Sequence, residues 1–232
     1  HARRGPQPRL QVAEGLGRRT GPGLILDQLG SLFSALERFY DEQAAQAGPA
    51  MLAQVAGELG RVTAGDITVP EPAPLPATQL LERLDPGADP VLGEFLGLAG
   101  ALTWTQTAAY AETLSSHFLD NYGYVRLVGP TAAALVSSTR VAVGVGVWGS
   151  GLYYPRHAHP SEEAYHVLAG DVGFSGADGV RRELHPGDCA HNGPDEPHEL
   201  WFGAPGEDPD RSPPCVLLWA WVGEIGVDAR LV

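Results

Sequence analysis

Residues 157–166 contain side chains that can bind a metal ion. His157 and His159 are two residues apart, so on a strand both imidazoles project to the same face. Glu163 and Tyr165 have the same spacing on what we predict to be the next strand. Two imidazoles and a carboxylate that converge on one face suit a borderline or harder divalent metal ion.

A fourth metal ligand must come from a distant part of the chain. The sequence offers two histidines after the turn predicted at residues 186–188. We favour His198 and keep His191 as the alternative ligand. His166 points to the opposite side of its strand from Tyr165, because neighbouring side chains of a strand alternate.

These residues lie in a half of the chain whose pattern is that of an antiparallel β-structure. From residue 122 onward Val, Gly, Tyr and Trp dominate, and turn signals recur at intervals of roughly 8–12 residues. Residues 141–148 alternate Val with Ala or Gly, and further strands are predicted at 164–169, 172–174, 199–202 and 216–222. Many short strands joined by polar turns favour a barrel or a sandwich.

The first half of the chain is predicted to be helical. Apolar side chains recur at spacings of three and four over residues 24–47, and shorter helical patterns follow at 50–59, 78–84, 91–99 and 105–119. The fold class is therefore α+β, with a flexible tail at residues 1–20, a helical region at 21–120 and a metal-binding β-domain at 121–232. The apolar stripes of the helical region should cover the β-domain or form a homodimer interface.

Two motifs identify the β-domain more closely. The pattern G-x5-H-x-H-x3-E-x6-G over residues 151–170 resembles the first motif of the cupin family, and residues 186–198 resemble the second. The asparagine that usually follows the histidine of the second motif is missing here. The resemblance implies a cupin β-barrel, or double-stranded β-helix, with one divalent transition metal ion per chain. The ion would be zinc, manganese, iron, nickel or cobalt, and the implied ligands are His157, His159, Glu163 and His198.

A narrower pattern, Y-x2-H-x-H-x3-E-x-Y over residues 154–165, is similar to that of the cupin dimethylsulfoniopropionate lyases, the Ddd group. A helical portion before the barrel is most similar to the L-type member, DddL. The resemblance implies a β-elimination that cleaves dimethylsulfoniopropionate into dimethyl sulfide and acrylate. Other readings stay open: another metallocupin enzyme, such as a dioxygenase or an isomerase, or a non-catalytic cupin that binds a small ligand.

Two tyrosines are candidates for the proton transfer. Tyr165 should project toward the metal ion, and a nearby cation favours the phenolate, so we expect Tyr165 to be the general base. Tyr154 is three residues before His157, and only a bend near Pro155 would bring it to the same face. We therefore expect Tyr154 to position the substrate or to act as a secondary base.

The implied substrate is a small zwitterion whose other end is a methylated sulfonium cation. Aromatic faces attract such a cation. The sequence leaves open which of the available rings bind it, and the candidates are Tyr122, Tyr124, Trp148, Trp201, Trp219 and Trp221.

Composition narrows the class of protein further. The 232 residues carry a net charge of −13, which argues against nucleic acid or an anionic membrane as a partner. All 15 residues in the Lys and Arg count are arginine, so Schiff-base chemistry on a lysine is excluded. Cys189 and Cys215 are too few for a disulfide framework, and we expect two buried thiols in the cytoplasm.

Overall fold

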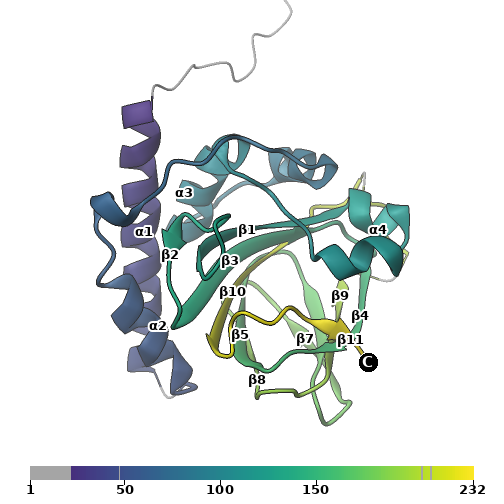
Figure 1. Ribbon diagram of the computed structural model, residues 1–232. Coiled ribbons are helices and arrows are strands. Elements are labelled where there is room, and N and C mark those ends of the chain that lie inside the picture. The colour runs from purple at the N-terminus through teal and green to yellow at the C-terminus, as the bar shows by residue number, and fades with distance from the viewer. Residues whose placement is uncertain (1–21, 47, 205, 210) are drawn as a thin grey trace, which may run out of the picture.

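Helices, a six-stranded sheet and a five-stranded sheet form three successive layers (Figure 1). The computed structural model describes residues 22–46, 48–204, 206–209 and 211–232, and the tail predicted at residues 1–20 lies outside this part of the chain. The helical elements are α1 (Pro22–Ala45), α2 (Met51–Leu59), η1 (Ala64–Asp66), η2 (Pro76–Arg83), α3 (Pro90–Leu98), η3 (Ala99–Ala101), η4 (Ala108–Glu112) and α4 (Ser116–Asp120).

The strands pair in the pattern of a cupin β-barrel, so the predicted α+β fold class is confirmed. One sheet has the order β2-β1-β3-β10-β5-β8 and the other the order β11-β4-β9-β6-β7. The bounds are β1 (Tyr122–Gly129), β2 (Val136–Ser137), β3 (Val141–Trp148), β4 (Tyr153–Ala158), β5 (Ser161–Ala169), β6 (Val172–Ser175), β7 (Arg181–Leu184), β8 (Cys189–Asn192), β9 (His198–Phe202), β10 (Cys215–Gly223) and β11 (Arg230–Leu231).

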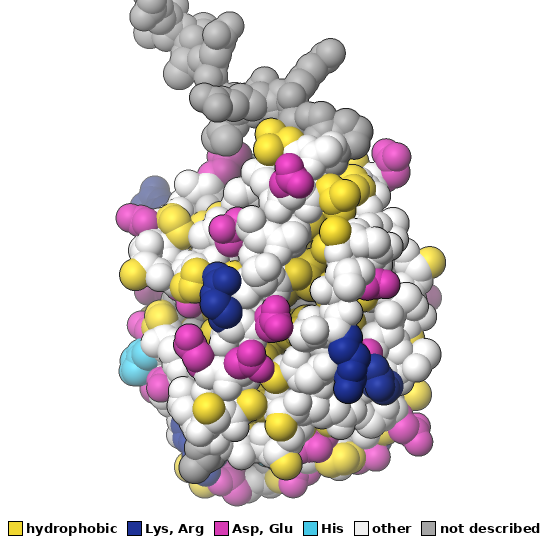
Figure 2. Space-filling model, turned by 90° about the vertical axis from the view of Figure 1, so that its left-hand side faces the viewer, with side chains coloured by type: hydrophobic (Ala, Val, Ile, Leu, Met, Phe, Trp, Pro, Cys, Tyr) yellow, Lys and Arg dark blue, Asp and Glu magenta, His cyan; other side chains and the backbone are white. Residues whose placement is uncertain are grey.

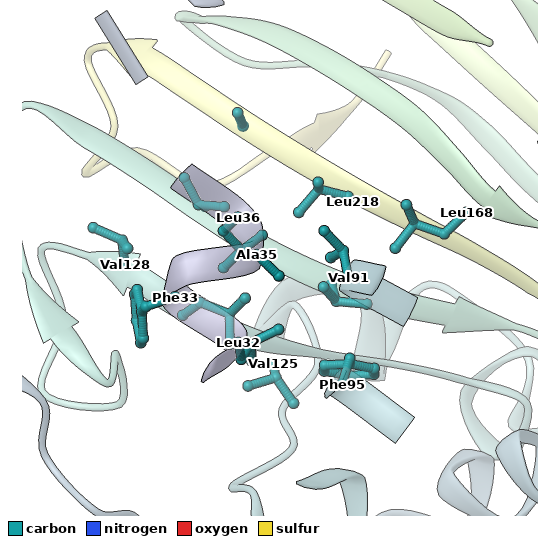
Figure 3. Close-up of a cluster of buried hydrophobic side chains, with 14 of the residues drawn as sticks. Leu32, Phe33, Ala35, Leu36, Val91, Phe95, Val125, Val128, Leu168 and Leu218 are labelled. Carbon is teal, nitrogen blue, oxygen red and sulfur yellow. The ribbon is translucent and has the colours of Figure 1, made fainter. Parts of the chain in front are cut away.

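The helical layer packs on the outer face of the six-stranded sheet. Figure 3 shows side chains of α1 and α3, among them Leu32 and Phe95, against Val125, Leu168 and Leu218 of the sheet. All five side chains are at most 5% exposed. Burial of this apolar surface holds the helices on the barrel, and each fully buried side chain contributes roughly 1.5–3 kcal/mol.

Strand β3 packs against the helices on one face and against the interior of the barrel on the other, because its side chains alternate. Its four valines belong to the core under the helices, whereas Ala142 and Trp148 belong to the core between the two sheets. Gly144 and Gly146 share that inner face, and they leave space for the indole rings of Trp219 and Trp148. In this alternation the valines pack against the helices, and the glycines leave room for indole rings inside the barrel.

Substituting Gly144 by alanine should destabilise the protein by about 1–3 kcal/mol, the usual cost of overpacking. A Cβ atom there would overlap the ring of Trp219 and the backbone oxygen of Val125. Thermal unfolding followed by circular dichroism measures the effect. Gly97→Ala is the control, because no atom lies within 4 Å of its added Cβ and alanine favours a helix. A melting temperature in Gly144→Ala as high as in Gly97→Ala would contradict this account of β3.

The structure corrects two expectations from the sequence. The continuous helix predicted at residues 105–119 is wrong: Thr105 forms a bridge with Tyr124, and two short helical segments, η4 and α4, follow. Ser115 interrupts the pattern because its side chain accepts the Phe118 N–H as the N-cap of α4. Both cysteines are free, but Cys189 is exposed, since it lies on the edge strand β8, and only Cys215 is buried.

A neutral histidine lies under helix α1. His166, on β5, is 2% exposed, and its ring meets the rings of Phe39 and Tyr40 edge-on at 5.0 Å and 5.7 Å. Its Nδ1 atom has no hydrogen-bond partner among the described residues, and the Sγ atom of Cys189 is 3.9 Å from Nε2. Burial lowers the pKa of His166 to about 4, so the docking of α1 favours the uncharged imidazole.

His166 should therefore make the protein less stable as the pH falls below the unfolded-state pKa of about 6.5. We expect the free energy of unfolding of the wild type to fall by about 2 kcal/mol more than that of His166→Gln between pH 8 and pH 5. Urea unfolding at the two pH values measures the difference. His117→Gln, at an exposed position, is the matched control and should follow the wild type. Equal pH dependence of wild type and His166→Gln would show that His166 is not the cause.

The outer surface of the helical layer does not identify a partner. Figure 2 shows apolar side chains on this face scattered among acidic ones and a few arginines. The homodimer interface expected here stays a prediction, as does the division of the chain into a tail, a helical region and a β-domain. No helix in the described part of the chain is both long and apolar enough to cross a membrane.

Candidate active site

A pocket between the two sheets collects most of the residues that the sequence singled out. It is lined by His157, His159, Glu163, Tyr154 and Tyr165. Of the six aromatic candidates for the sulfonium, five line it as well: Tyr122, Tyr124, Trp148, Trp219 and Trp221. Trp201 lies outside it, where its ring stacks on Tyr153 at 5.3 Å and under Arg181 at 4.7 Å.

Three of the four predicted metal ligands form a tight group. The ligand atoms of His159, Glu163 and His198 all lie within 4.8 Å of one another, and the three residues are buried. Glu163 Oε2 is 3.0 Å from His159 Nε2 and 3.2 Å from His198 Nε2. The strands explain the meeting, because β4 pairs with β9 so that His157 faces His198 across the ladder. His157 adjoins the group, with its ring 4.1 Å from that of His198.

Backbone carbonyls fix the orientation of each imidazole. Nδ1 of His157 donates to the Pro155 carbonyl at 2.8 Å, Nδ1 of His159 to Ser161 at 2.9 Å, and Nδ1 of His198 to Glu196 at 2.9 Å. These bonds place a proton on each Nδ1. Nε2 of His157 and Nε2 of His198 then carry a lone pair, whereas Nε2 of His159 forms a hydrogen bond with Glu163 at 3.0 Å. Metal-binding histidines usually donate their other ring N–H in this way, and the hydrogen bond fixes the orientation of the ring.

The resulting site fits a cation. The Nε2 atoms of His157 and His198 are buried and have no hydrogen-bond partner among the described residues. A carboxylate oxygen and the lone pairs of nearby Nε2 atoms repel one another unless a positive ion lies among them. Nitrogen and oxygen donors of this kind suit a divalent transition metal ion. The donor set is therefore able to hold such an ion, and it does not identify the metal.

Further contacts stabilise the ionised form of Glu163. Its Oε1 accepts the Trp221 indole N–H at 2.6 Å, and the Asn192 side chain lies 3.5 Å from Oε2. Burial raises the pKa of Glu163, but the charge and hydrogen bond of His159 outweigh it and hold that pKa well below its usual range. Burial together with the neighbouring His198 lowers the pKa of His157 to about 3, which keeps its ring neutral.

The two predicted tyrosines both reach the pocket. Tyr165 lies two residues after Glu163 on β5, and its ring is 6.0 Å from that of His198. Burial, reinforced by the negative charge of Glu163, raises the pKa of its phenol. Ionisation of Tyr165 therefore requires a compensating positive charge nearby.

Tyr154 reaches the pocket through a distortion of its strand. The pairing of β4 with β9 shifts between Tyr154 and His157, so a bulge puts both side chains on the inner face. The Tyr154 ring stacks on His157 at 4.0 Å, and its hydroxyl is 2.6 Å from that of Tyr110. The bend near Pro155 that the spacing required is thus present.

His191, the alternative ligand, lies outside the pocket, and three residues that the sequence analysis did not name lie in or behind its wall. His191 is on the surface, where its Nε2 pairs with Glu162 at 2.8 Å, so His198 and not His191 joins the ligand group. Sequence reasoning missed Thr107 and Arg126 in the pocket wall, and Tyr110 behind Tyr154. Alternation along β1 carried a signal for Arg126, because it shares a face with Tyr122 and Tyr124.

Comparisons with known proteins show the family to which the chain belongs. Residues 63–207 match the model of the dimethylsulfoniopropionate lyase family. The chain is 31% identical over 127 residues to the dimethylsulfoniopropionate lyase DddQ of Ruegeria pomeroyi, and the match covers 55% of this chain and 58% of that relative. The chain thus spans somewhat more than half the length of this curated relative.

Two solved structures share the fold. A chain from the crystal structures of the DMSP lyases RdDddP and RnDddQII has a TM-score of 0.69 at 24% identity, and 90% of this chain and 99% of that chain are covered. DddQ from Ruegeria pomeroyi has a TM-score of 0.69 at 22% identity, with 89% and 96% covered. The named sequence relative is DddQ, and these matches do not support the L-type expected from the sequence. On the match of more than half its length to the family model, the chain belongs to the dimethylsulfoniopropionate lyase family.

Proposed function

We propose that the protein cleaves dimethylsulfoniopropionate by β-elimination. The observation that carries the proposal is the buried group of His159, Glu163 and His198, with Tyr165 beside it in a pocket lined by aromatic rings. The family match supports the same substrate. Within the family, DddQ is the relative on which we base the assignment.

The reaction balances without any redox partner. A base removes a proton from the carbon next to the carboxylate, and the C–S bond on the neighbouring carbon breaks. The electrons of the C–H bond form the new C=C bond, and those of the C–S bond leave with sulfur. The products are acrylate, dimethyl sulfide and a proton. The difficult feature is the negative charge that develops beside an existing carboxylate.

His159, Glu163 and His198 would hold the metal ion, and His157, whose ring is 4.1 Å from that of His198, would be the fourth ligand. A divalent ion at this site would act as a Lewis acid that stabilises negative charge on the carboxylate side of the substrate. The identity of the metal stays open among zinc, manganese, iron, nickel and cobalt.

Tyr165 is the proposed general base, and its phenolic oxygen receives the proton. Burial opposes its ionisation, and a positive ion held by the neighbouring ligands would lower its pKa. Tyr154 is tied to Tyr110 by a hydroxyl contact of 2.6 Å and stacks on His157, which suits a residue that positions the substrate. Burial raises the pKa of Tyr154, and the neighbouring phenols of Tyr110 and Tyr122 raise it further, which disfavours a role as the base.

Headspace gas chromatography of dimethyl sulfide tests the proposal. Purified protein is incubated with dimethylsulfoniopropionate before and after chelation and after metal is added back. Release that chelation suppresses and metal restores is the expected result. No release from metal-loaded protein would overturn the proposal, and oxygen uptake with another substrate would then favour a dioxygenase.

We also propose that the protein works in the reducing cytoplasm. Both cysteines are free, which suits a compartment that keeps thiols reduced. Activity that is unchanged by dithiothreitol and by mild oxidant would agree with thiols that take no part in the chemistry.

A further inference from the structure

Arg126 is the only arginine that is buried within the part of the chain that the structure describes. It lies on β1, its side chain is 7% exposed, and it lines the same pocket as the ligand group. The register of β1 against β3 shifts directly after it. Gly129 leaves room for its stem, because a Cβ at that position would lie 2.8 Å from Arg126 Cδ. The local backbone is thus shaped around this side chain.

The guanidinium group has few partners for a buried charge. Among the described residues we find no hydrogen bond from its side chain, and its one ion pair, with Asp228, is long at 3.9 Å. Asp228 is itself 63% exposed. A guanidinium offers five N–H donors and cannot lose its charge in a protein. Burying such a group with only one distant ion pair is costly, and an anion bound in the pocket would lower that cost.

Aromatic rings define the place where that anion would bind. The Cζ atom of Arg126 is 5.9 Å from the ring of Tyr124, 5.5 Å from that of Trp219 and 6.0 Å from that of Trp221. Trp221 also donates to Glu163, so one indole links the arginine to the ligand group. The rings leave the Arg126 side chain only 7% exposed, and low exposure strengthens its attraction for a carboxylate.

We propose that Arg126 binds the carboxylate of the substrate and thereby fixes the direction in which the substrate lies. The identity of the substrate rests on the proposed function, whereas the affinity for a carboxylate does not. A guanidinium fork matches the two oxygens of a carboxylate, and such charge-assisted bonds are roughly twice as strong as neutral ones.

The orientation of the substrate follows from the same charge. The sulfonium is repelled by Arg126, and the rings of Tyr124, Trp219 and Trp221 already face the guanidinium. Tyr122 and Trp148 line the same pocket, their rings are 5.4 Å apart, and the guanidinium faces three other rings. The sulfonium therefore lies beside Tyr122 and Trp148, away from Arg126.

Binding of propionate tests the inference, because propionate has the carboxylate but no sulfonium and is not cleaved. Isothermal titration calorimetry is done on metal-loaded wild type, Arg126→Met, Arg126→Lys and Asp228→Asn. Arg126→Met keeps the length of the stem and removes the charge, and Arg126→Lys keeps the charge and loses the fork. Circular dichroism and metal analysis confirm that each variant is folded and loaded.

The wild type should bind propionate, and Arg126→Met should bind it about tenfold more weakly or worse. Arg126→Lys should lie between them, and Asp228→Asn should bind like the wild type. If dimethylsulfoniopropionate is cleaved, KM should rise in Arg126→Met by a similar factor at unchanged metal content.

Three results would overturn the inference. They are no propionate binding by wild type, undiminished binding by Arg126→Met, or a loss in Asp228→Asn equal to that in Arg126→Met. The last would mean that Arg126 only holds the segment that carries Asp228. If Arg126→Met does not fold, Arg126→Lys decides, and full affinity in that variant would refute a role for the fork. Arginine-dependent propionate binding without any lyase activity would keep the anion site and reject the proposed substrate.

Discussion

In the Tyr165→Phe protein, release of dimethyl sulfide falls by about 100- to 10,000-fold, the range expected when a general base is removed. Only the hydroxyl is lost, so the buried ring keeps its contacts and its place near His198. Metal content should stay at the wild-type level, because the grouped donors His159, Glu163 and His198 are all unchanged. The measurement is kcat from gas chromatography, with metal content determined on the same sample.

Tyr153→Phe is the control for the loss of a phenol. Tyr153 is on the neighbouring strand β4, but it is 43% exposed and its hydroxyl donates to Glu199 at 2.5 Å. Its removal should leave activity within about twofold, as for most surface substitutions. Tyr154→Phe should raise KM more than it lowers kcat if Tyr154 positions the substrate. Full activity in Tyr165→Phe would reject this tyrosine as the base.

The His159→Ala protein should lose metal and activity together. It removes one of the three grouped donors, and the remaining pair, Glu163 and His198, would have only His157 beside it to complete the site. Mutating a residue that only hydrogen-bonds to a metal ligand typically lowers the affinity for the metal by about 10- to 100-fold. Loss of a ligand itself should therefore lower that affinity by about 100-fold or more. Metal content after dialysis and dimethyl sulfide release are measured together.

Thermal stability gives a second measurement for the same variant. A ligand that binds only the folded state stabilises it, so chelation should lower the melting temperature of the wild type. The His159→Ala protein should show no such shift. His191→Ala is the matched control, since His191 is on the surface with Glu162 and should keep both metal and activity. Stoichiometric metal in His159→Ala would exclude His159 from the ligand set.

Much of the site could be predicted because it is local in the sequence. His157, His159 and Glu163 fall within seven residues, and alternation along two adjacent strands is enough to orient them. His198 could be predicted as a ligand only from the resemblance to the second cupin motif, because its place opposite His157 depends on the pairing of β4 with β9. The fold class could be predicted because the sequence changes near residue 121 from a helical spacing of apolar residues to short strand patterns separated by turns.

The remainder depends on contacts that spacing does not encode. Tyr154 reaches the pocket only through a bulge, and a bulge leaves no clear mark in the sequence. Tyr110 meets Tyr154 across 44 residues, from a segment whose helical pattern concealed its role. The burial of Arg126 was not predicted, because it depends on the rings of β10 and on the space at Gly129, and alternation along β1 indicates only the face on which Arg126 lies.

The part of the pocket wall that comes from β1 and from the segment before it has a consequence for how members of this family can diverge. The grouped metal donors are encoded between residues 159 and 198, whereas Thr107, Tyr122 and Arg126 belong to a separate, earlier stretch of the chain. Substitutions in the earlier stretch can change which molecules enter without disturbing the donors. Chemistry and substrate choice are therefore separable under selection, and a new substrate can be acquired on an unchanged metal centre.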